Sequence, residues 1–124
     1  MKPVRVVLIE DNDVFRDALV LLFDLQEDVE LVASLADGSE AVGVCAKLAP
    51  DVAVLDYRLP GLDGVDVARA IRYACPDVAL VCLTAEIDGP AAEALRDAGV
   101  GECVLKDEPF EDIVAAIRRA GGGA

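Results

Sequence analysis

The sequence predicts an α/β fold in which a five-stranded parallel sheet is covered by helices on both faces. Short runs of Val, Leu and Ile alternate five times with segments of helical spacing, as expected of repeated strand–helix units. Hydrophobic residues make up 55% of the chain, with only two Tyr, three Phe and no Trp, and an aliphatic core suits strands buried on both faces. The 124 residues fit one domain. We expect it to span residues 1–120, with the Gly-rich residues 121–124 as a frayed tail or the start of a linker.

Five apolar runs are predicted to be strands, because each has the length of a strand and is bounded by turn-forming residues. They are Val4–Ile9, Glu30–Leu35, Val52–Leu55, Val78–Leu83 and Cys103–Leu105. Right-handed crossovers between parallel strands place helices on both faces of the sheet. We therefore expect a doubly wound, flavodoxin-like arrangement with strand order 2-1-3-4-5 and five helices.

Three of the predicted helices carry an apolar stripe at steps of three and four residues. The stripes are Phe15, Ala18, Leu19, Leu22 and Phe23; Val65, Ala68 and Ile71, with Arg72 at the edge of the stripe; and Phe110, Ile113, Val114 and Ile117. Asp37 followed by Glu40 resembles a capping box at the start of another helix, and Pro90 stands where a first-turn proline is tolerated. Gly99 and Gly101 are expected to bracket the turn before the fifth strand.

The strongly acidic composition limits the classes of partner. The formal net charge is −13 at pH 7, and such a surface repels nucleic-acid phosphates and anionic lipid. No apolar run has the length of a membrane span, and Val4–Ile9 is too short for a signal sequence. We therefore expect no direct contact of this domain with nucleic acid and none with a membrane.

The four cysteines show no Cys-x-x-Cys spacing, and there is no His to share a metal with them. They are Cys45, Cys75, Cys82 and Cys103. We interpret them as small buried hydrophobes of a protein in a reducing compartment, which predicts a cytoplasmic location.

Charged and polar side chains are predicted to gather at one edge of the sheet. The first strand runs into an acidic pair, the third into an aspartate, the fourth into a threonine and the fifth into a lysine: Glu10, Asp11, Asp56, Thr84 and Lys106. Because the carboxyl ends of parallel strands meet at one edge, these side chains should lie close together. Taken singly, each is explained as well by a turn, a helix cap or a solvated charge. Only their joint placement favours a functional site.

Such a set of groups has the parts for forming and losing an aspartyl phosphate. Adjacent carboxylates repel one another unless a proton or a cation relieves the repulsion, and oxygen-only ligands with vacant positions suit Mg²⁺. A central carboxylate can attack a phosphoryl group in line, while the metal and a lysine neutralise its oxygens and a hydroxyl hydrogen-bonds one of them. The Pro and Gly residues of loop 57–64 predict a tight connection beside that carboxylate.

Six segments closely resemble the receiver domains of two-component response regulators, particularly those of the NarL/FixJ type. They are residues 6–12, 36–41, 50–56, 59–64, 83–85 and 104–107, which together reach over nearly the whole chain. The acidic pair, the aspartate, the threonine and the lysine also stand in the order of that family. The combination is highly specific, and it implies a phosphorylation switch rather than an enzyme with a separate substrate.

The resemblance implies a role for most of the strand-end residues. Asp56 is expected to accept a phosphoryl group from the phosphohistidine of a sensor histidine kinase, and Lys106 to pair with that group. Mg²⁺ is the expected cofactor. Its expected ligands are Asp11, Asp56 and the backbone carbonyl of Arg58, with Glu10 acting through a water.

The same resemblance implies how the signal leaves the domain. Thr84 is expected to swing toward the phosphoryl group and to shift the face formed by the fourth helix, the fifth strand and the fifth helix, within an existing two-state equilibrium. Regulators of this type usually continue into a helix-turn-helix DNA-binding domain. The expected partners are therefore the kinase, such an output domain and, on phosphorylation, a second copy of the chain.

Three positions modify this expectation. The family usually has Tyr or Phe three residues before the lysine, and the burial of this aromatic side chain accompanies activation. Cys103 stands there instead, so the switch is expected to be weaker or to signal activation through another residue. For Cys103 itself, packing is a simpler explanation than a redox role. Arg58 and Glu86 stand two residues after Asp56 and Thr84, where the family tunes phosphate lifetime. Their opposite charges could pair and shield the acyl phosphate, although two solvated charges explain them equally well.

Two alternatives use the same residues differently. In a small phosphatase of the haloacid-dehalogenase type, Asp11 is the nucleophile and Asp13 the acid. Against it, no acidic pair ends a strand after Lys106, and Asp56 has no role. In the second alternative the chain is a receiver-shaped interaction module that no longer accepts phosphate, and the intact five-residue set argues against this.

Overall fold

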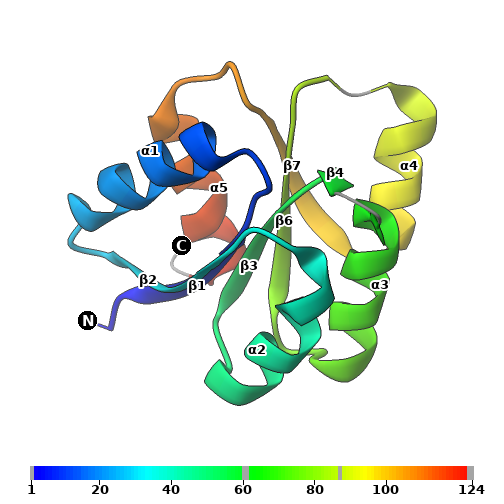
Figure 1. Ribbon diagram of the computed structural model, residues 1–124, viewed down its shortest axis with the longest axis horizontal. Coiled ribbons are helices and arrows are strands. Elements are labelled where there is room, and N and C mark those ends of the chain that lie inside the picture. Colours follow the sequence, from blue (N-terminus) through cyan, green and yellow to red (C-terminus); the bar gives the residue numbers. More distant parts are fainter. Residues whose placement is uncertain (1, 60–61, 87, 123–124) are drawn as a thin grey trace.

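The fold has three layers, with a parallel sheet between two layers of helices (Figure 1). The computed structural model describes residues 2–59, 62–86 and 88–122. Within these residues, no helix combines the length and the apolar character that crossing a bilayer requires. The predicted turn residues Pro60 and Gly61, and the last two residues of the Gly-rich tail, lie outside the described part of the chain.

The sheet contains five parallel strands in the order β2-β1-β3-β6-β7. They are β1 (Val4–Ile9), β2 (Val29–Leu35), β3 (Val52–Asp56), β6 (Ala79–Thr84) and β7 (Val100–Leu105). Counted in chain order, this is the predicted order 2-1-3-4-5, which is confirmed. Two further strands, β4 (Arg58–Leu59) and β5 (Leu62–Asp63), pair antiparallel outside the sheet. This hairpin occupies the loop that the sequence predicted only as a tight connection.

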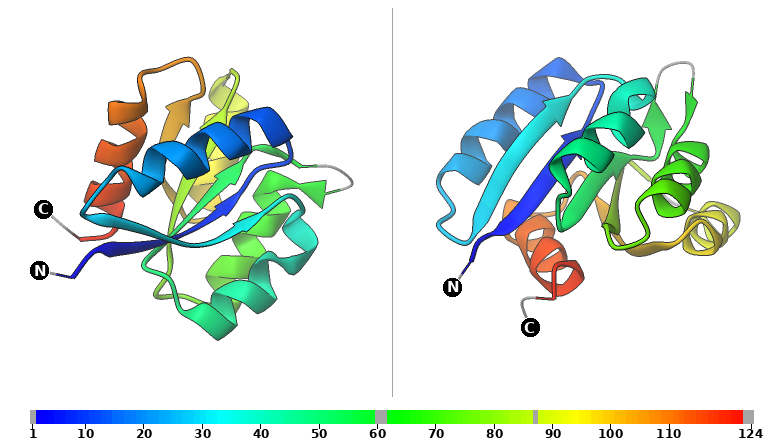
Figure 2. Two further views of the ribbon diagram at one scale, coloured as in Figure 1. Left: turned by 60° about the vertical axis from the view of Figure 1, so that its left-hand side comes forward. Right: turned by 90° about the horizontal axis from the view of Figure 1, so that it is seen from below.

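Five α-helices cover the sheet, as predicted for the part of the chain that is described. They are α1 (Asp13–Asp24), α2 (Ala41–Leu48), α3 (Gly64–Ala74), α4 (Gly89–Asp97) and α5 (Phe110–Ala120). Figure 2 shows α1 and α5 on one face and α2, α3 and α4 on the other. Each face has its own apolar core, one built around Phe23 and Ile117 and the other around Leu55 and Ile71.

Strand β7 begins earlier than predicted, because Gly101 lies inside the strand and not in the preceding turn. The register between β6 and β7 shifts by one residue there, from Leu80 opposite Val100 to Val81 opposite Glu102. Gly101 is therefore the extra residue of a β-bulge, a position where glycine is common inside strands. Gly99 does lie in the turn, with a φ of 98° that favours glycine.

The stripe predicted for α1 is only partly buried. Leu19 and Phe23 belong to the core and Phe15 packs against it, but Ala18 and Leu22 are exposed. The helix therefore buries a narrower face, one residue per turn, than its apolar content suggested. Its solvent side carries further exposed apolar side chains: Val14, Leu21 and, just after the helix, Leu25.

The capping box predicted from Asp37 and Glu40 is also wrong in detail. Asp37 accepts a hydrogen bond from the backbone N–H of Ser39 at 2.8 Å and caps a short 3₁₀ turn, η1 (Gly38–Glu40). Helix α2 follows directly, with no side-chain hydrogen bond from Glu40 at its start. Because the 3₁₀ turn already satisfies the first backbone N–H groups, the reciprocal bond of a capping box has no place.

Candidate functional site

The carboxyl ends of four strands bring together side chains that are far apart in the sequence. Glu10 and Asp11 follow β1, Asp56 ends β3, Thr84 ends β6 and Lys106 follows β7. In Figure 1 these strand ends lie at the upper edge of the sheet. Backbone hydrogen bonds continue the sheet at this edge, from the N–H of Lys106 to the carbonyl of Thr84 at 2.8 Å and from that of Tyr57 to Leu83 at 3.0 Å. The side chains are therefore carried by rigid backbone and not by free loops.

Lys106 bridges two carboxylates at the centre of the site. Its Nζ lies 2.6 Å from Oδ2 of Asp56 and 2.7 Å from Oε1 of Glu10. The ammonium also lies 4.9 Å from the centroid of the Phe15 ring, in a cation–π contact. Burial alone would lower the pKa of Lys106, but the two carboxylates beside it, Asp56 first and Glu10 second, outweigh this effect and raise the pKa. The lysine therefore stays positively charged beside the aspartate.

Glu10 is fully buried, although it is a carboxylate. Its Oε2 accepts a hydrogen bond from the backbone N–H of Asn12 at 2.9 Å. Its Oε1 is close to Lys106, but not in a direction that makes a well-formed hydrogen bond, and no other described residue donates to it. Burial raises the pKa of Glu10 to about 7, against the lowering effect of Lys106 and of the Asn12 N–H. Among the described residues, Oε1 is thus held only by its ion pair with Lys106, and it retains lone-pair capacity for a cation or a proton.

Three carboxylates converge tightly enough to share one cation. One oxygen from each of Glu10, Asp11 and Asp56 lies within 4.8 Å of the other two. Glu10 and Asp56 are buried, while Asp11 is accessible to solvent. An all-oxygen set with one open side fits Mg²⁺ better than a metal that prefers nitrogen or sulfur, and the unused oxygen of Glu10 supports the same fit.

The side chains of the three other predicted residues on the rim of the site, Thr84, Arg58 and Glu86, make no hydrogen bond with the carboxylate of Asp56 in the described part of the chain. Thr84 is buried, and its hydroxyl donates to the backbone carbonyl of Glu86 at 2.8 Å. The side chains of Arg58 and Glu86 are exposed, and in the described part of the chain no ion pair joins them. The contact of Arg58 with the site is through its backbone, whose N–H donates to Oδ1 of Asp56 at 3.1 Å.

The strand-end side chains line an open pocket of about 370 Å³. Its lining consists of Asp11, Asn12, Asp56, Arg58, Thr84, Ala85, Glu86 and Lys106. A negative carboxylate and a positive ammonium therefore face the same solvent-filled space. An anionic group the size of a phosphoryl group can enter there and meet both.

Gly64 fixes the path of the chain beside Asp56. Its N–H donates to the carbonyl of Tyr57 at 3.0 Å. A Cβ atom at Gly64 would lie 2.3 Å from that carbonyl oxygen and 2.6 Å from the carbonyl oxygen of Asp56, far inside van der Waals contact. The sequence indicated a turn glycine here, but the structure shows that the requirement is a close approach of two backbone segments.

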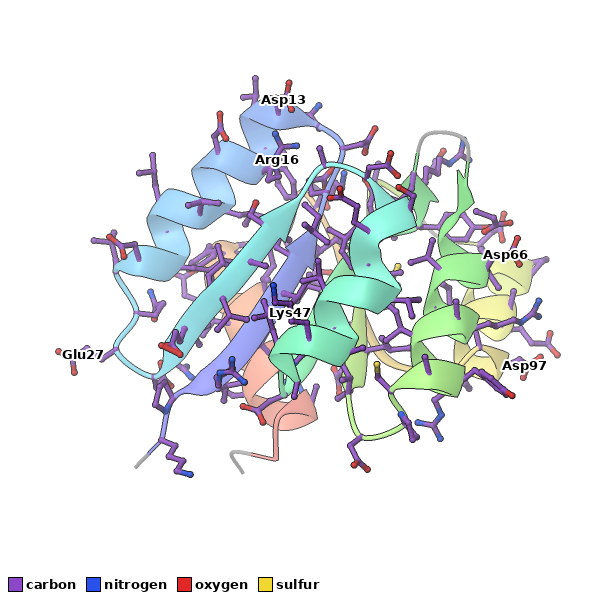
Figure 3. The ribbon with its side chains drawn as sticks, turned by 60° about the horizontal axis from the view of Figure 1, so that its bottom comes forward. Asp13, Arg16, Glu27, Lys47, Asp66 and Asp97 are labelled. Carbon is purple, nitrogen blue, oxygen red and sulfur yellow. The ribbon has the colours of Figure 1, made fainter. Side chains whose placement is uncertain are left out.

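Three residues around the acidic pair were not predicted as part of the site. Asn12 caps α1 by accepting from the N–H of Phe15 at 2.9 Å, and Phe15 packs beside Lys106. Arg16 donates to the backbone carbonyl of Glu10 at 2.8 Å and pairs with Asp13 at 2.6 Å; Figure 3 shows this pair at the start of α1. An Asn between a strand and a helix is a capping signal that could have identified the first of them.

The pairing of Asp13 bears on the phosphatase alternative. That alternative needs Asp13 to face the same space as Asp11, where it would act as an acid. The Asp13 side chain is 78% exposed and bound to Arg16, and it is not among the residues that line the pocket. The geometry gives this arrangement no support.

Cys103 departs from the prediction that the cysteines are buried. Cys45 and Cys82 are buried and Cys75 is half-buried, but Cys103 is exposed. The reason is its place on β7, an edge strand of the sheet, where a hollow of about 130 Å³ lies between the strand and α4.

Comparisons with known proteins agree on one family. The sequence model of the response regulator receiver domain matches residues 6–118. The chain is 39% identical over 119 residues to a probable transcriptional regulatory protein NarL of Mycobacterium tuberculosis, covering 94% of this chain and 54% of that protein. It is 32% identical over 120 residues to the transcriptional regulatory protein LiaR of Bacillus subtilis, covering 97% of this chain and 57% of that protein. The chain thus spans about half the length of these curated relatives.

A solved structure supports the same likeness in three dimensions. The signal receiver domain of the response regulator NarL from Mycobacterium tuberculosis superposes with a TM-score of 0.92 at 32% sequence identity. The match covers 100% of both chains.

Proposed function

Because this chain belongs to the receiver domain family of two-component response regulators, in the NarL group, we propose that it is a phosphorylation-dependent switch whose phosphate-accepting residue is Asp56. The observation that carries the proposal is the contact of Lys106 with Asp56 at 2.6 Å, at the wall of an open pocket and beside two further carboxylates. A structural ion pair alone would need neither the pocket nor the extra negative charges.

The proposed chemistry is attack of an Asp56 carboxylate oxygen on a phosphorus atom. The bond between phosphorus and the donor nitrogen of a phosphohistidine breaks as the bond to Asp56 forms. Lys106 is placed to stabilise the negative charge on the transferred oxygens, because its ammonium already lies at the carboxylate. The domain catalyses only its own phosphorylation and dephosphorylation in this proposal, and it is not an enzyme with a separate substrate.

The proposed cofactor is Mg²⁺, held by Asp11 and Asp56, by the backbone carbonyl of Arg58 and, through a water, by Glu10. The convergence of the three carboxylates and the unused buried oxygen of Glu10 support it. When bound, the ion supplies positive charge that offsets the charge of the carboxylates and of the phosphoryl oxygens. Glu10 and Asp11 then serve to hold it beside the attacking oxygen.

The proposed switch begins at Thr84. Its hydroxyl is bound to the carbonyl of Glu86, and phosphorylation of Asp56 offers it a stronger, charged acceptor. Breaking the bond to Glu86 frees the start of the segment that leads to α4, and this favours the second state of the face made by α4, β7 and α5. Cys103 stands on this face at the position where the family usually has Tyr or Phe. The lack of that aromatic side chain supports a weaker coupling between phosphorylation and this face than is common in the family.

The partners remain proposals too. We propose a sensor histidine kinase as the phosphate donor, a second copy of the chain on phosphorylation, and an output domain that is the part in contact with DNA. The net charge of −13 supports the view that the receiver itself makes no contact with nucleic acid. A cytoplasmic location stays a prediction of the sequence.

The test is mass spectrometry after incubation with acetyl phosphate and Mg²⁺. We expect one phosphoryl group on the wild type, mapped to Asp56, and none on Asp56→Asn. The matched control is Asp97→Asn, the same change at the exposed end of α4, which should be labelled like the wild type. A label on Asp11 would contradict the proposal and favour the phosphatase. Absence of any label, together with no response to beryllofluoride and Mg²⁺, would favour an interaction module.

The lifetime of the phosphate is expected to depend on Arg58 and Glu86. Both line the pocket, so their side chains can restrict the access of water to phospho-Asp56 even though they are not paired. We expect a shorter half-life in the Arg58→Ala, Glu86→Ala double variant. The control is Asp66→Ala, Arg69→Ala, which removes a charge pair from α3 at 3.8 Å and leaves the pocket intact. An unchanged half-life in the first double variant would rule out shielding.

A further inference from the structure

Two free cysteines lie directly opposite each other on neighbouring strands near the site. Cys82 of β6 and Cys103 of β7 are register partners in the parallel ladder. The bulge at Gly101 produces this pairing, because without the one-residue shift Cys82 would face Glu102. Neighbouring strands lie about 4.8 Å apart, and Cα atoms joined by a disulfide are usually about 4.4–6.8 Å apart. The backbone therefore already has a separation that a disulfide tolerates.

The two thiols differ in access and in acidity. Cys103 is exposed, at the hollow between α4 and β7, whereas Cys82 is fully buried. The interaction between the two neighbouring thiols lowers the pKa of Cys103 and raises that of Cys82, and the Cys82 thiol donates to the backbone carbonyl of Leu83 at 3.6 Å. An oxidant thus meets Cys103 first, because this thiol is exposed and loses its proton more readily than that of Cys82, which lies opposite it in the ladder.

We propose that Cys82 and Cys103 form a reversible intramolecular disulfide when the domain meets a peroxide. The Cys103 thiolate attacks one oxygen of hydrogen peroxide, which leaves a sulfenic acid on Cys103 and releases water. The sulfur of Cys82 then attacks the sulfenic sulfur, the S–O bond breaks, and a second water leaves with the thiol proton. In total two thiols lose two electrons and two protons, and one peroxide becomes two waters.

The position of this bond connects it to the switch, and that connection rests on the proposed function. Cys82 lies two residues before Thr84, and Cys103 three residues before Lys106. A covalent link between β6 and β7 restrains the two strands that carry the hydroxyl and the ammonium to the pocket. Disulfides that depart from ideal geometry are reduced more easily, so a link across adjacent parallel strands suits a reversible modification.

The chain offers a second cysteine pair as an internal comparison. Burial first, and the neighbouring Cys75 second, raise the pKa of Cys45, so these two sulfurs also lie near each other. They are on α2 and at the end of α3, away from the strand ends of the site. Neither sulfur of this pair is as exposed as Cys103, and we expect peroxide to leave the pair reduced.

The test is peptide mapping of the intact domain after brief treatment with hydrogen peroxide and alkylation of the remaining thiols. Cleavage before Asp and after Lys and Arg separates the four cysteines, and it places Cys82 in residues 77–87 and Cys103 in residues 97–106. We expect these two peptides to be joined, with an intact mass lower by about 2 Da from the loss of two hydrogens, and separated again by dithiothreitol. Cys103→Ser should abolish the link, and Cys75→Ser should retain it.

Other products would overturn the inference. A link that contains Cys45 or Cys75, a dimer joined through Cys103, or Cys103 oxidised only to the sulfinic or sulfonic acid would each show that Cys82 does not capture the sulfenic acid. A second experiment compares the rate of labelling by acetyl phosphate in the oxidised and the reduced wild type, with Cys103→Ser as the variant that cannot form the disulfide. Equal rates would end the connection to the switch but not the disulfide, while failure of labelling in both forms would count only against the proposed function.

Discussion

Replacing Glu10 by Gln tests the electrostatics of the site without any phosphate chemistry. Glu10 is fully buried, and one of its oxygens has no well-formed hydrogen bond from a described residue. In the metal-free protein its ionised form is therefore disfavoured, and glutamine mimics the neutral acid at nearly the same size. The variant should remove a pH dependence of stability that the wild type has.

The magnitude follows from the two pKa values. Burial raises the pKa of Glu10 from 4.5 to about 7, so the folded protein holds this proton more tightly than the unfolded chain does. The associated stability is fully present below pH 4.5 and is lost as the pH rises through about 7. The difference between the two pKa values corresponds to about 3 kcal/mol, most of which is lost between pH 5 and pH 8.

The assay is urea unfolding in the presence of a chelator at pH 5 and at pH 8. We expect the stability of Glu10→Gln relative to the wild type to rise by about 2–3 kcal/mol between these two pH values. The control is Glu27→Gln, because Figure 3 shows Glu27 projecting from the loop after α1 into solvent. The titration of the other carboxylates is common to all three proteins and cancels in the comparison.

A stability difference between Glu10→Gln and the wild type that does not change with pH would refute the reasoning. If the difference between Glu10→Gln and the wild type is the same at pH 5 and pH 8, Glu10 titrates as an ordinary carboxylate. Its buried position would then be stabilised fully by Lys106, and the site would have no unused affinity for a cation. The absolute offset between the two proteins does not enter this comparison, so a small loss of packing in the variant does not obscure it.

Three further perturbations probe the site and its support. Mg²⁺ added at pH 8 should raise the free energy of unfolding of the wild type by about 2.7 kcal/mol at a concentration of 100 times Kd, and the thermal midpoint should rise with it. Asp11→Asn should lose most of this response, whereas Asp24→Asn, at the far end of α1, should keep it. Gly64→Ala should destabilise the domain by about 2 kcal/mol or more in urea, because its Cβ would overlap the Tyr57 carbonyl oxygen. Gly43→Ala, with no atom within 4 Å of the new Cβ inside α2, should stabilise by about 0.5–1 kcal/mol, and equal effects of the two glycine changes would contradict this account of backbone approach.

The strands and their order could be predicted because the apolar runs and the turns between them are local signals. The strand-end residues could be placed at one edge for the same reason, since parallel strands must end together. What the sequence did not contain is the contact geometry: that Lys106 bridges Glu10 and Asp56, and that one oxygen of Glu10 is left over. These depend on side-chain directions set by packing of the whole domain.

The register between β6 and β7 is the clearest case of information that the sequence hides. Glycine indicated a turn at Gly101, and this shortened the predicted strand to Cys103–Leu105. The bulge reverses both conclusions, because it lengthens β7 and moves Cys103 opposite Cys82. A lone exposed cysteine and a buried one, apparently unrelated in the chain, become neighbours through one inserted residue.

The order in which the site's parts occur along the chain has a consequence for its synthesis. As the nascent polypeptide leaves the ribosome, the acidic pair emerges first, Asp56 much later, and Lys106 after all the other site residues, directly behind β7. Until β7 docks against β6, the buried carboxylates have no ammonium beside them, and their mutual repulsion opposes closure of that edge. Before β7 is in place, the site therefore lacks the positive charge that offsets its buried carboxylates, and this edge of the sheet is the last part of the site to form.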